Sequence, residues 1–420
     1  MKAEKKTFFA GMVGNILEWY DFVVYGFLAA IIGKLFFPSG NATVELLKSF
    51  AVFAVGFLMR PVGAIIFGYI GDKFGRKKAL TISIVMMAIS TTAIGLLPTY
   101  ETVGILAPVL LVLLKLIQGL SVGGEYTTSV SFLVEYAPQD KRGLYGSVGI
   151  LGAVVGILLG SASGAFITKV LSEDALYSWG WRVLFFTGVI LGLVGYYIRK
   201  HIDETPKFLE LEYEELKSKS PLKELFTKGR SQLLKTFALS TFQAVGFYII
   251  FVYIASHLSV FVKFPKSVAL TINTVSMIIL FLLIPVFGFL SDKYGRKPFI
   301  LFSTFFTLIL AYPLFSFISS GSFENALIGQ VVFAVIVAGF MAILPTTLVE
   351  IFPTEIRNSG YSIGYNLPFA IFGGTSPLIA TYLIKETGNL ASPAYYLMFA
   401  AAIAFITGLF LKETAKEPLK

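Results

Sequence analysis

The sequence predicts an all-α integral membrane protein with twelve transmembrane helices, arranged as two pseudo-symmetric six-helix bundles. Three observations predict this fold: the composition, the recurrence of long apolar segments, and an internal repeat. The chain has 420 residues, of which 56% are hydrophobic and only 14% charged, and its mean hydropathy is +0.78. Soluble domains carry about 25% charged residues. The chain therefore lacks the polar surface that a soluble protein needs.

Apolar segments long enough to cross a hydrocarbon core of about 30 Å recur along the whole chain. They lack the alternation of strands and are longer than the strands of membrane barrels, so we expect helices. The first segment is too long for a cleaved signal peptide and is expected to remain in the membrane. The twelve predicted spans are 8–35, 49–70, 79–97, 104–134, 144–168, 182–199, 236–260, 268–290, 299–319, 326–350, 359–384 and 394–411.

The distribution of charge predicts the orientation of these helices. The chain has 34 Lys and Arg against 25 Asp and Glu, a net charge of +9. Most of the basic residues fall in the tails and in the loops after even-numbered helices, which is the bias that places such segments in the cytoplasm. The positive charge therefore needs no nucleic-acid partner. We expect a multi-pass protein of the cell (inner) membrane with both termini in the cytoplasm.

Composition also excludes several functional classes. The chain has no Cys and two His, so it offers no disulfide, no thiolate nucleophile and no paired-His metal site. The sequence contains no nucleophile–base pair and no Gly-x4-Gly-Lys-(Ser/Thr) phosphate-binding loop. We therefore expect neither an enzyme nor an ATP-driven pump, and we expect no cofactor and no metal.

Two strings recur in the same order at nearly equal offsets. "GYIGDKFGRKK" at 68–78 returns as "GFLSDKYGRKP" at 288–298, and "LVEYAPQDKR" at 133–142 returns as "LVEIFPTEIR" at 348–357. This pattern predicts a duplicated six-helix unit, as in transporters built from parallel repeats. The predicted parts are an N-terminal half (1–198), a cytoplasmic loop between the halves (199–235) and a C-terminal half (236–420).

The repeated motifs place charges of both signs at the cytoplasmic ends of the helices. Glycines in the first motif allow a tight turn, and its Asp can face the N-terminus of a neighbouring helix. We expect one cluster in each half, Asp72–Arg142–Glu135 and Asp292–Arg357–Glu350, that closes in one conformation and opens in the other. The alternative is ordinary orientation charge. The predicted gating residues are Asp72, Arg76, Glu135, Arg142, Asp292, Arg296, Glu350 and Arg357.

Charged residues also fall inside the first, second and fourth predicted helices. At 1.5 Å per residue, Glu18 lies about 15 Å beyond Phe8, close to the middle of the bilayer. A lone charge at that depth costs between about 2.5 and 17 kcal/mol, so these residues must face a shared watery interior and neutralise one another. The acids Glu18, Asp21 and Glu125 outnumber the bases Arg60 and Lys115 by one. One proton or one cationic headgroup would balance that excess.

These residues divide into two predicted roles. The carboxylates Glu18, Asp21 and Glu125 are candidates for proton coupling, with Asp21 and Glu125 preferred. Arg60, Lys115 and the neighbouring Gln118 are candidates for substrate binding. The alternative is a set of internal salt bridges that hold three helices together, although buried ion pairs often stabilise a protein no better than apolar packing does.

Aromatic and polar residues extend the candidate site. Trp19, Tyr20 and Tyr25 beside Asp21 either pack or form a box for a quaternary ammonium, with cation–π contacts of about 0.5–2 kcal/mol each. His257 is expected at the outer membrane interface. In the second half, polar side chains at membrane depth either complete the site or join helices. They are Gln243, Tyr248, Asn273 and Asn366, of which Tyr248 and Asn366 are the predicted substrate contacts.

The motif after helix 2, Gly-x3-Asp-(Lys/Arg)-x-Gly-Arg-(Lys/Arg), resembles the signature of the major facilitator superfamily, and the resemblance covers the whole chain. Within it, four strings are similar to the metabolite:proton symporter family: "GNILEWYDFVVYG", "GFLMRPVGAIIFGYIGDKFGRKK", "QGLSVGGEY" and "WGWRVLFFTGVILGLVGYYIRKHIDETPKF". The resemblance implies two six-helix halves that import organic acids or zwitterions with a proton by alternating access. It implies a translocation path lined by Glu18, Asp21, Tyr25, Arg60, Lys115, Gln118 and Glu125.

Three further strings favour one substrate class. "LLKLIQGLSVGGEYTTSVSFLVEYAPQDKRG", "PAYYLM" and "LKETAKEPLK" are most similar to the proline/glycine betaine transporters, whereas citrate and 2-oxoglutarate relatives more often carry Arg where Lys115 stands. We expect a monomeric proton symporter for proline or glycine betaine. The alternatives are a di- or tricarboxylate:proton symporter and a membrane-embedded solute sensor without flux. Because the sequence ends after "KEPLK", osmotic gating by an extended C-terminal coiled coil is not expected.

Overall fold

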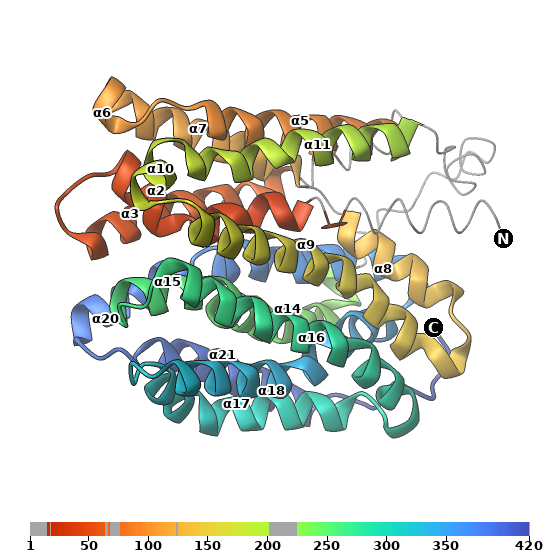
Figure 1. Ribbon diagram of the computed structural model, residues 1–420. Coiled ribbons are helices and arrows are strands. Elements are labelled where there is room, and N and C mark those ends of the chain that lie inside the picture. The colour runs from red at the N-terminus through yellow and green to blue at the C-terminus, as the bar shows by residue number, and fades with distance from the viewer. Residues whose placement is uncertain are drawn as a thin grey trace.

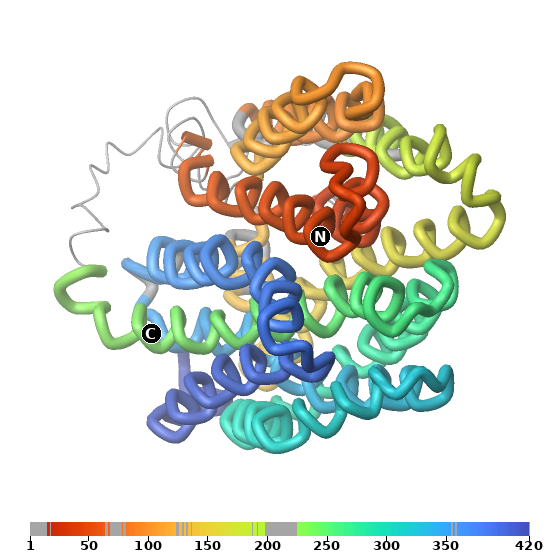
Figure 2. Tube along the Cα trace, turned by 90° about the vertical axis from the view of Figure 1, so that its left-hand side faces the viewer, coloured from red at the N-terminus to blue at the C-terminus, as the bar shows by residue number. Residues whose placement is uncertain are grey.

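The computed structural model describes residues 15–16, 18–63, 66–67, 76–122, 125–200 and 225–419. Over these residues the chain is a bundle of long helices that run in roughly the same direction, and it contains no strand (Figure 1). Figure 2 shows the helices up to residue 200 gathered in one part of the bundle and those after residue 225 in the other.

In the first part of the chain, the described residues form seven principal helices and several short ones. The first span is helical over 18–27 and continues, after a bend of 62°, as Ala29–Phe36 (α2). Two short elements, Glu173–Ala175 (α10) and the π-helical Leu176–Gly180 (η2), precede the last long helix. The others are Ala42–Leu58 (α3), Arg76–Leu96 (α5), Tyr100–Val103 (α6), Leu106–Ser121 (α7), Glu125–Tyr136 (α8), Gln139–Lys141 (η1), Arg142–Val170 (α9) and Trp181–Lys200 (α11).

The second part repeats the pattern with π-helical interruptions. Its first span is built from Arg230–Phe247 (α14), the π-helical Tyr248–Tyr253 (η3), Ile254–Ser256 (α15) and the π-helical His257–Phe261 (η4). The remaining elements are Lys266–Tyr294 (α16), Lys297–Ile318 (α17), Phe323–Glu350 (α18), Thr354–Pro368 (α19), the π-helical Phe369–Gly373 (η5), Ser376–Thr387 (α20) and Pro393–Leu409 (α21).

These helices account for the predicted spans. Eight described helices are long and apolar enough to cross a membrane, the bent pair at the start of the chain adds a ninth, and three shorter apolar helices are Thr81–Leu96, Leu106–Ser121 and Pro393–Leu409. The prediction of an all-α membrane fold is confirmed.

The observed helices differ in detail from two of the predicted spans. The second helix begins at Ala42 and not at 49, because Asn41 caps it: the Asn41 side chain accepts hydrogen bonds from the N–H groups of Thr43 and Val44. The first span was expected as one helical segment over 8–35, and within the described residues its helix bends at Leu28. No Pro lies at the bend, so the composition of the segment gives no sign of it.

The two parts of the chain pack through close helix contacts. α9 lies along α16, where a Cβ on Gly143 would meet the Gly288 carbonyl at 2.7 Å. Further along the same pair of helices, Asn273 donates a hydrogen bond to Ser161 at 3.1 Å. Contacts between the halves are therefore present along much of the length of the bundle.

Within the first half, glycines bring α3 and α7 together. A Cβ on Gly119 would collide with the Gly56 carbonyl, and a Cβ on Gly56 would lie 3.2 Å from the Lys115 carbonyl. This close approach fixes Lys115 between the two helices. A larger residue therefore has no room at Gly119, and one at Gly56 would press against the Lys115 carbonyl.

The substitution Gly119→Ala is expected to destabilise the protein, because an overpacked site costs about 1–3 kcal/mol. The apparent melting temperature in detergent should fall measurably. Gly246→Ala is the matched control, since the nearest heavy atoms to a Cβ there lie at 3.8 Å, which is ordinary contact. An unchanged melting temperature for Gly119→Ala would contradict the packing described here.

Candidate functional site

A buried ion pair joins the first and second spans. Arg60 Nη2 donates to Glu18 Oε1 at 3.0 Å, and the two side chains are only 4% and 6% exposed. The Arg60 Nε atom is buried and has no acceptor among the described residues. The structure thus brings together two of the predicted site residues, and it leaves part of the guanidinium unused.

Lys115 heads a second polar group nearby. Its ammonium donates to Gln118 Oε1 at 2.6 Å, and the Gln118 amide donates to Thr91 Oγ1 at 2.8 Å. Lys115 forms no ion pair within the described part of the chain. Asp21, one turn beyond Glu18, is also buried, and its Oδ1 accepts no hydrogen bond from the described residues.

Aromatic rings surround both cations. The Arg60 carbon Cζ lies 5.4–5.7 Å from the ring centroids of Trp19, Phe22 and Phe57. Lys115 Nζ lies 4.5 Å from the Tyr25 ring, 4.9 Å from the Phe22 ring and 5.6 Å from the Phe53 ring. Trp19 and Tyr25 were predicted to bind the cationic group of a ligand. In this conformation their rings contact Arg60 and Lys115 of the protein itself.

The opposite wall comes from the second half. Phe247 at the end of α14 contacts the Trp19 ring at 5.8 Å, and Phe369 of η5 contacts it at 6.2 Å. Tyr248 of η3 lies 5.0 Å from the Phe57 ring, and its hydroxyl is buried without a hydrogen-bond partner. The π-helical segments η3 and η5 therefore supply two of the three rings of this wall. Such turns occur frequently at functional sites.

Other predicted residues lie away from this group. Asn366 donates to the Ser362 carbonyl at 3.0 Å, and none of its hydrogen bonds reaches Arg60 or Lys115. Asn273 bonds to Ser161 and the Phe251 carbonyl. His257, which was expected at the outer membrane interface, is fully buried in the protein beside the end of α17, with Nε2 2.8 Å from Ser319 Oγ. Its depth in the membrane stays a prediction.

Some predicted residues cannot be placed. Asp72 lies outside the described residues, and the side chains of Arg76 and Glu125 are not described, although Arg76 begins α5 and Glu125 begins α8. Their predicted roles in gating and proton coupling stay predictions.

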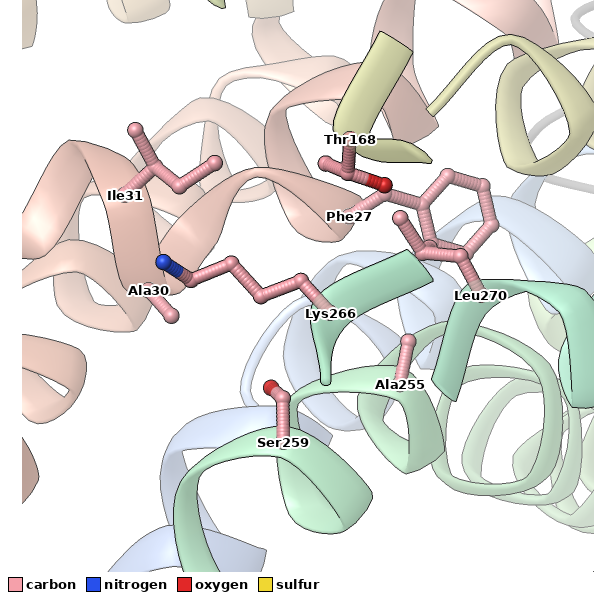
Figure 3. Close-up of a pocket in the computed structure, with 8 residues that line it drawn as sticks. All are labelled: Phe27, Ala30, Ile31, Thr168, Ala255, Ser259, Lys266 and Leu270. Carbon is pink, nitrogen blue, oxygen red and sulfur yellow. The ribbon is translucent and has the colours of Figure 1, made fainter. Parts of the chain in front are cut away.

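A small cavity lies at the end of the bundle that holds α2 and α10. Its volume is about 10 Å³, room for roughly one water. Figure 3 shows Lys266 at the start of α16 extending toward Ala30 and Ile31 of α2. The cavity is lined by none of the predicted site residues, so the watery interior expected between helices 1, 2 and 4 stays a prediction.

At the other end of the bundle, charged residues link the two halves. Glu135 of α8 pairs with Arg357 of α19 at 2.7 Å, and Arg142 of α9 pairs with Glu350 of α18 at 3.4 Å. The expected grouping of these four residues within each half is therefore wrong. In a parallel repeat, equivalent helix ends face one another across the pseudo-symmetry axis, so each acid meets the base of the other half.

Two more predicted residues complete this charged cluster. Arg296 pairs with Glu350 at 3.1 Å and with Asp292 at 2.9 Å. Asp292 also accepts hydrogen bonds from the N–H groups of Gly143 and Leu144 at 2.7 and 3.0 Å, at the N-terminus of α9. A carboxylate is favoured there by the helix dipole. The cluster closes this end of the bundle.

The segment after α21 reinforces the cluster and was missed from the sequence. Thr414 donates to Glu350 Oε2 at 2.6 Å, and Arg142 Nη2 donates to the Glu417 carbonyl at 2.5 Å. The Glu413 carboxylate accepts from the N–H groups of Arg296 and Lys297 at 2.8 and 3.1 Å. Nothing in the sequence indicates that the polar segment after the last helix folds back onto the bundle.

Glu350→Gln is expected to loosen the closed end, because it removes the buried counter-charge of Arg142 and leaves Arg296 paired with Asp292 alone. Removing one partner of a buried pair costs about 3–5 kcal/mol. The native chain has no Cys, so Ser147→Cys, in α9 against Gly288, provides a single thiol. Thiol labelling in membranes should accelerate by at least about tenfold in the Glu350→Gln background.

The matched control for this labelling experiment is Glu386→Gln, since Glu386 is 50% exposed in an ion pair with Lys385. That change should leave the labelling rate as it was. Equal rates in the Glu350→Gln and control backgrounds would mean that the cluster does not hold this end closed.

Glu413 gives a prediction for pH. Burial alone would raise the pKa of its carboxyl, but hydrogen bonds from the backbone N–H groups of Arg296, Ala415, Lys297 and Thr414 hold the pKa below its usual value of 4.5. The anion is therefore the stabilising form, and its contribution is lost as pH falls. Glu413→Gln should lower the melting temperature at pH 7, and the difference should shrink toward pH 4. Glu417→Gln, in the same segment, is the control; a difference that grows in acid would contradict this assignment.

Comparisons with known proteins agree with this architecture. A family model described as sugar (and other) transporter matches residues 6–225 and again 209–420. A glycine betaine/proline/ectoine/pipecolic acid transporter of Dickeya dadantii and a proline/betaine transporter of Escherichia coli K12 are each 40% identical over 425 residues, 99% of this chain and 85% of theirs. A putative proline/betaine transporter of Staphylococcus aureus is 35% identical over 100% of this chain and 91% of its own length.

Solved structures show the same fold. A xylose transporter from E. coli in a partially occluded inward-open conformation superposes with a TM-score of 0.79 over 100% of both chains, at 19% identity. A D-xylose–proton symporter has a TM-score of 0.79 at 21% identity, over 99% of this chain and 100% of its own. The predicted major facilitator fold is confirmed.

Proposed function

Because this chain belongs to the sugar (and other) transporter family and is 40% identical to transporters of proline and betaine, we propose that it imports zwitterions of that kind together with protons. The observation that carries the proposal is the Arg60–Glu18 pair, buried among rings where the two halves meet. A positive and a negative side chain at this depth can bind a solute that itself carries one charge of each sign. A membrane helix keeps such costly charges for function.

Transport follows an alternating-access cycle between two halves, residues 1–198 and 236–420, joined by the loop 199–235. Support comes from the two family matches, which divide the chain near this loop. The charged cluster closes the cytoplasmic end when the solute enters from outside, and both termini lie in the cytoplasm. We propose that one chain suffices for transport, because the site is built from the two halves of a single chain.

Proton coupling is assigned to Asp21. The residue is 3% exposed, and its Oδ1 accepts no hydrogen bond from the described residues. The positive charge of Lys115 acts on this carboxylate, although the described residues include no direct salt bridge between the two. A buried carboxylate without a full set of donors is costly as an anion and gains from protonation. Glu125 remains the second candidate for this role.

A di- or tricarboxylate substrate is less well supported. Such an anion needs at least two free bases, whereas Arg60 is already neutralised by Glu18 and Lys115 lies wedged between α3 and α7. A sensor without flux differs from a transporter in one measurable respect, the accumulation of solute. Uptake therefore separates the three functions.

The test is uptake into proteoliposomes under an imposed inward proton gradient. Proline and glycine betaine should accumulate, whereas citrate and 2-oxoglutarate should not compete. Binding of the zwitterions without accumulation would favour the sensor, and uptake of the carboxylates would favour the alternative substrate class.

Asp21→Asn separates transport from proton coupling. Because Asn cannot take up a proton, accumulation driven by the gradient should be lost. Counterflow of labelled proline, which needs no net proton movement, should persist within about tenfold of the unmodified protein. If Asp21→Asn accumulates solute at the normal level under the proton gradient, another carboxylate must carry the coupled proton.

A further inference from the structure

The π-helical segment η3 presents two tyrosines to one face of α3. Tyr248 packs against the rings of Phe53 and Phe57, with centroids 5.9 and 5.0 Å apart. Tyr253 packs against the Phe50 ring at 6.1 Å. The three phenylalanines follow helical spacing, so they lie on one face of α3. Two residues of the second half, five positions apart, therefore meet a single face of a helix in the first half.

This arrangement depends on the π-helical form of η3. In an α-helix of 3.6 residues per turn, an advance of five residues is a rotation of about 500°, which leaves the two side chains about 140° apart. In a π-turn the hydrogen bond joins residues i and i+5, so residues five apart lie nearly one above the other. Tyr248 and Tyr253 can therefore both face α3 while η3 is π-helical, and they would diverge in an α-helix.

Two amide side chains from other helices donate to carbonyls of this turn. Asn273 of α16 donates through Nδ2 to the Phe251 carbonyl at 2.8 Å. Gln330 of α18 donates through Nε2 to the Ile250 carbonyl, and the same nitrogen donates to Asn273 Oδ1 at 3.4 Å. Both residues are fully buried. The two amides therefore form one polar group that covers two consecutive carbonyls in the middle of η3.

These donors favour the π-helical form. A π-turn interrupts the regular series of hydrogen bonds of an α-helix. Inside a bilayer there is no water for a carbonyl that loses its donor, so side chains of neighbouring helices must satisfy it. A buried group left unpaired costs about 1–3 kcal/mol. The amides of Asn273 and Gln330 remove that cost where η3 needs it.

The other π-turn at the site, η5, is held in a different way. Thr375 Oγ1 donates to the Ile371 carbonyl at 2.5 Å, and Ser376 Oγ donates to the Phe372 carbonyl at 2.6 Å. These hydroxyls follow the turn in the same span, so η5 receives donors from its own segment. The form of η3 depends instead on donors from α16 and α18, and changes in those two helices can alter it.

We propose that Asn273 and Gln330 are positioning residues: they hold η3 in its π-helical form and thereby direct Tyr248 to the place where the two halves meet. The Tyr248 hydroxyl is buried there, has no hydrogen-bond partner among the described residues and is available to an oxygen of the solute. Neither amide needs to touch the solute. This inference rests on the proposed function for its effect on solute binding, whereas its effect on the helix is independent of any solute.

The first experiment tests the helix without a solute. Because the native chain has no Cys, two cysteine pairs can be introduced in separate full-length proteins: Phe57→Cys with Tyr248→Cys, and Phe50→Cys with Tyr253→Cys. In membranes, a short bifunctional thiol reagent should bridge both pairs while both amides are present. When Asn273→Leu and Gln330→Leu are added, the bridging yield of at least one pair should fall by about fivefold or more, because the two positions then diverge.

The matched control is Ser161→Ala. It removes the other acceptor of the same Asn273 amide, at 3.1 Å, and leaves the donation to the Phe251 carbonyl in place, so both pairs should still be bridged. Equal bridging of both pairs with and without the two amides would overturn the proposal. If the double variant does not fold, Gln330→Leu alone should lower the yield of at least one pair, and unchanged yields in that folded protein would count against the proposal.

The second experiment measures the binding of glycine betaine. Asn273→Leu and Tyr248→Phe should each weaken binding by about fivefold or more, and the double variant should bind no more weakly than the weaker single variant, because both changes remove the same contact. In uptake, Asn273→Leu should raise KM and leave the maximal rate within about twofold. A merely structural role of Asn273 predicts that the two costs add, as they do for independent sites. Additive costs would therefore overturn the assignment to Tyr248.

The two experiments separate this inference from the proposed function. A protein that transports zwitterions, but keeps both bridges when the amides are removed, would overturn the positioning role alone. A protein that neither binds nor transports any zwitterion, but loses a bridge when the amides are removed, would overturn the proposed function and support the role of the amides in the helix.

Discussion

The architecture depends on a constraint imposed by the bilayer: a charge placed at its centre must meet an opposite charge or a ligand. Arg60 and Glu18 pair across the first two spans, and aromatic rings surround the guanidinium. The helices that carry these charges must therefore stay together. Within the first half, the close approach of α3 and α7 at Gly56 and Gly119 also holds the span that carries Arg60 against the helix that carries Lys115.

Closure at one end of the bundle also depends on buried ion pairs. Arg142, Arg296 and Arg357 each reach a carboxylate, and two of the pairs cross from one half to the other. Asp292 adds a second kind of link, from a side chain of α16 to the backbone at the start of α9. The halves are thus joined by contacts that can be broken without any loss of packing inside either half.

The sequence was sufficient for features that depend on local pattern. Hydropathy located the spans, and helical spacing placed Glu18 and Arg60 at one depth, where they meet. The sequence did not predict features that depend on tertiary packing. No Pro marks the bend at Leu28. The pairing of Glu135 and Glu350 with arginines of the other half becomes visible only once the interface between the halves is known. The rings of Phe53 and Phe57 were missed because one aromatic residue in an apolar helix looks like any other.

The π-helical turns at Tyr248–Tyr253 and Phe369–Gly373 have an evolutionary consequence. A π-turn arises when a helix accommodates one surplus residue, and it can be resolved by losing that residue. Both turns present aromatic side chains to the place where the halves meet. An insertion or deletion of a single residue within one of these two helices would thus change the direction of all the side chains that follow it, including those that line the site. Diversification among relatives can therefore proceed by changes of length in the middle of a membrane helix, as well as by replacement of individual side chains.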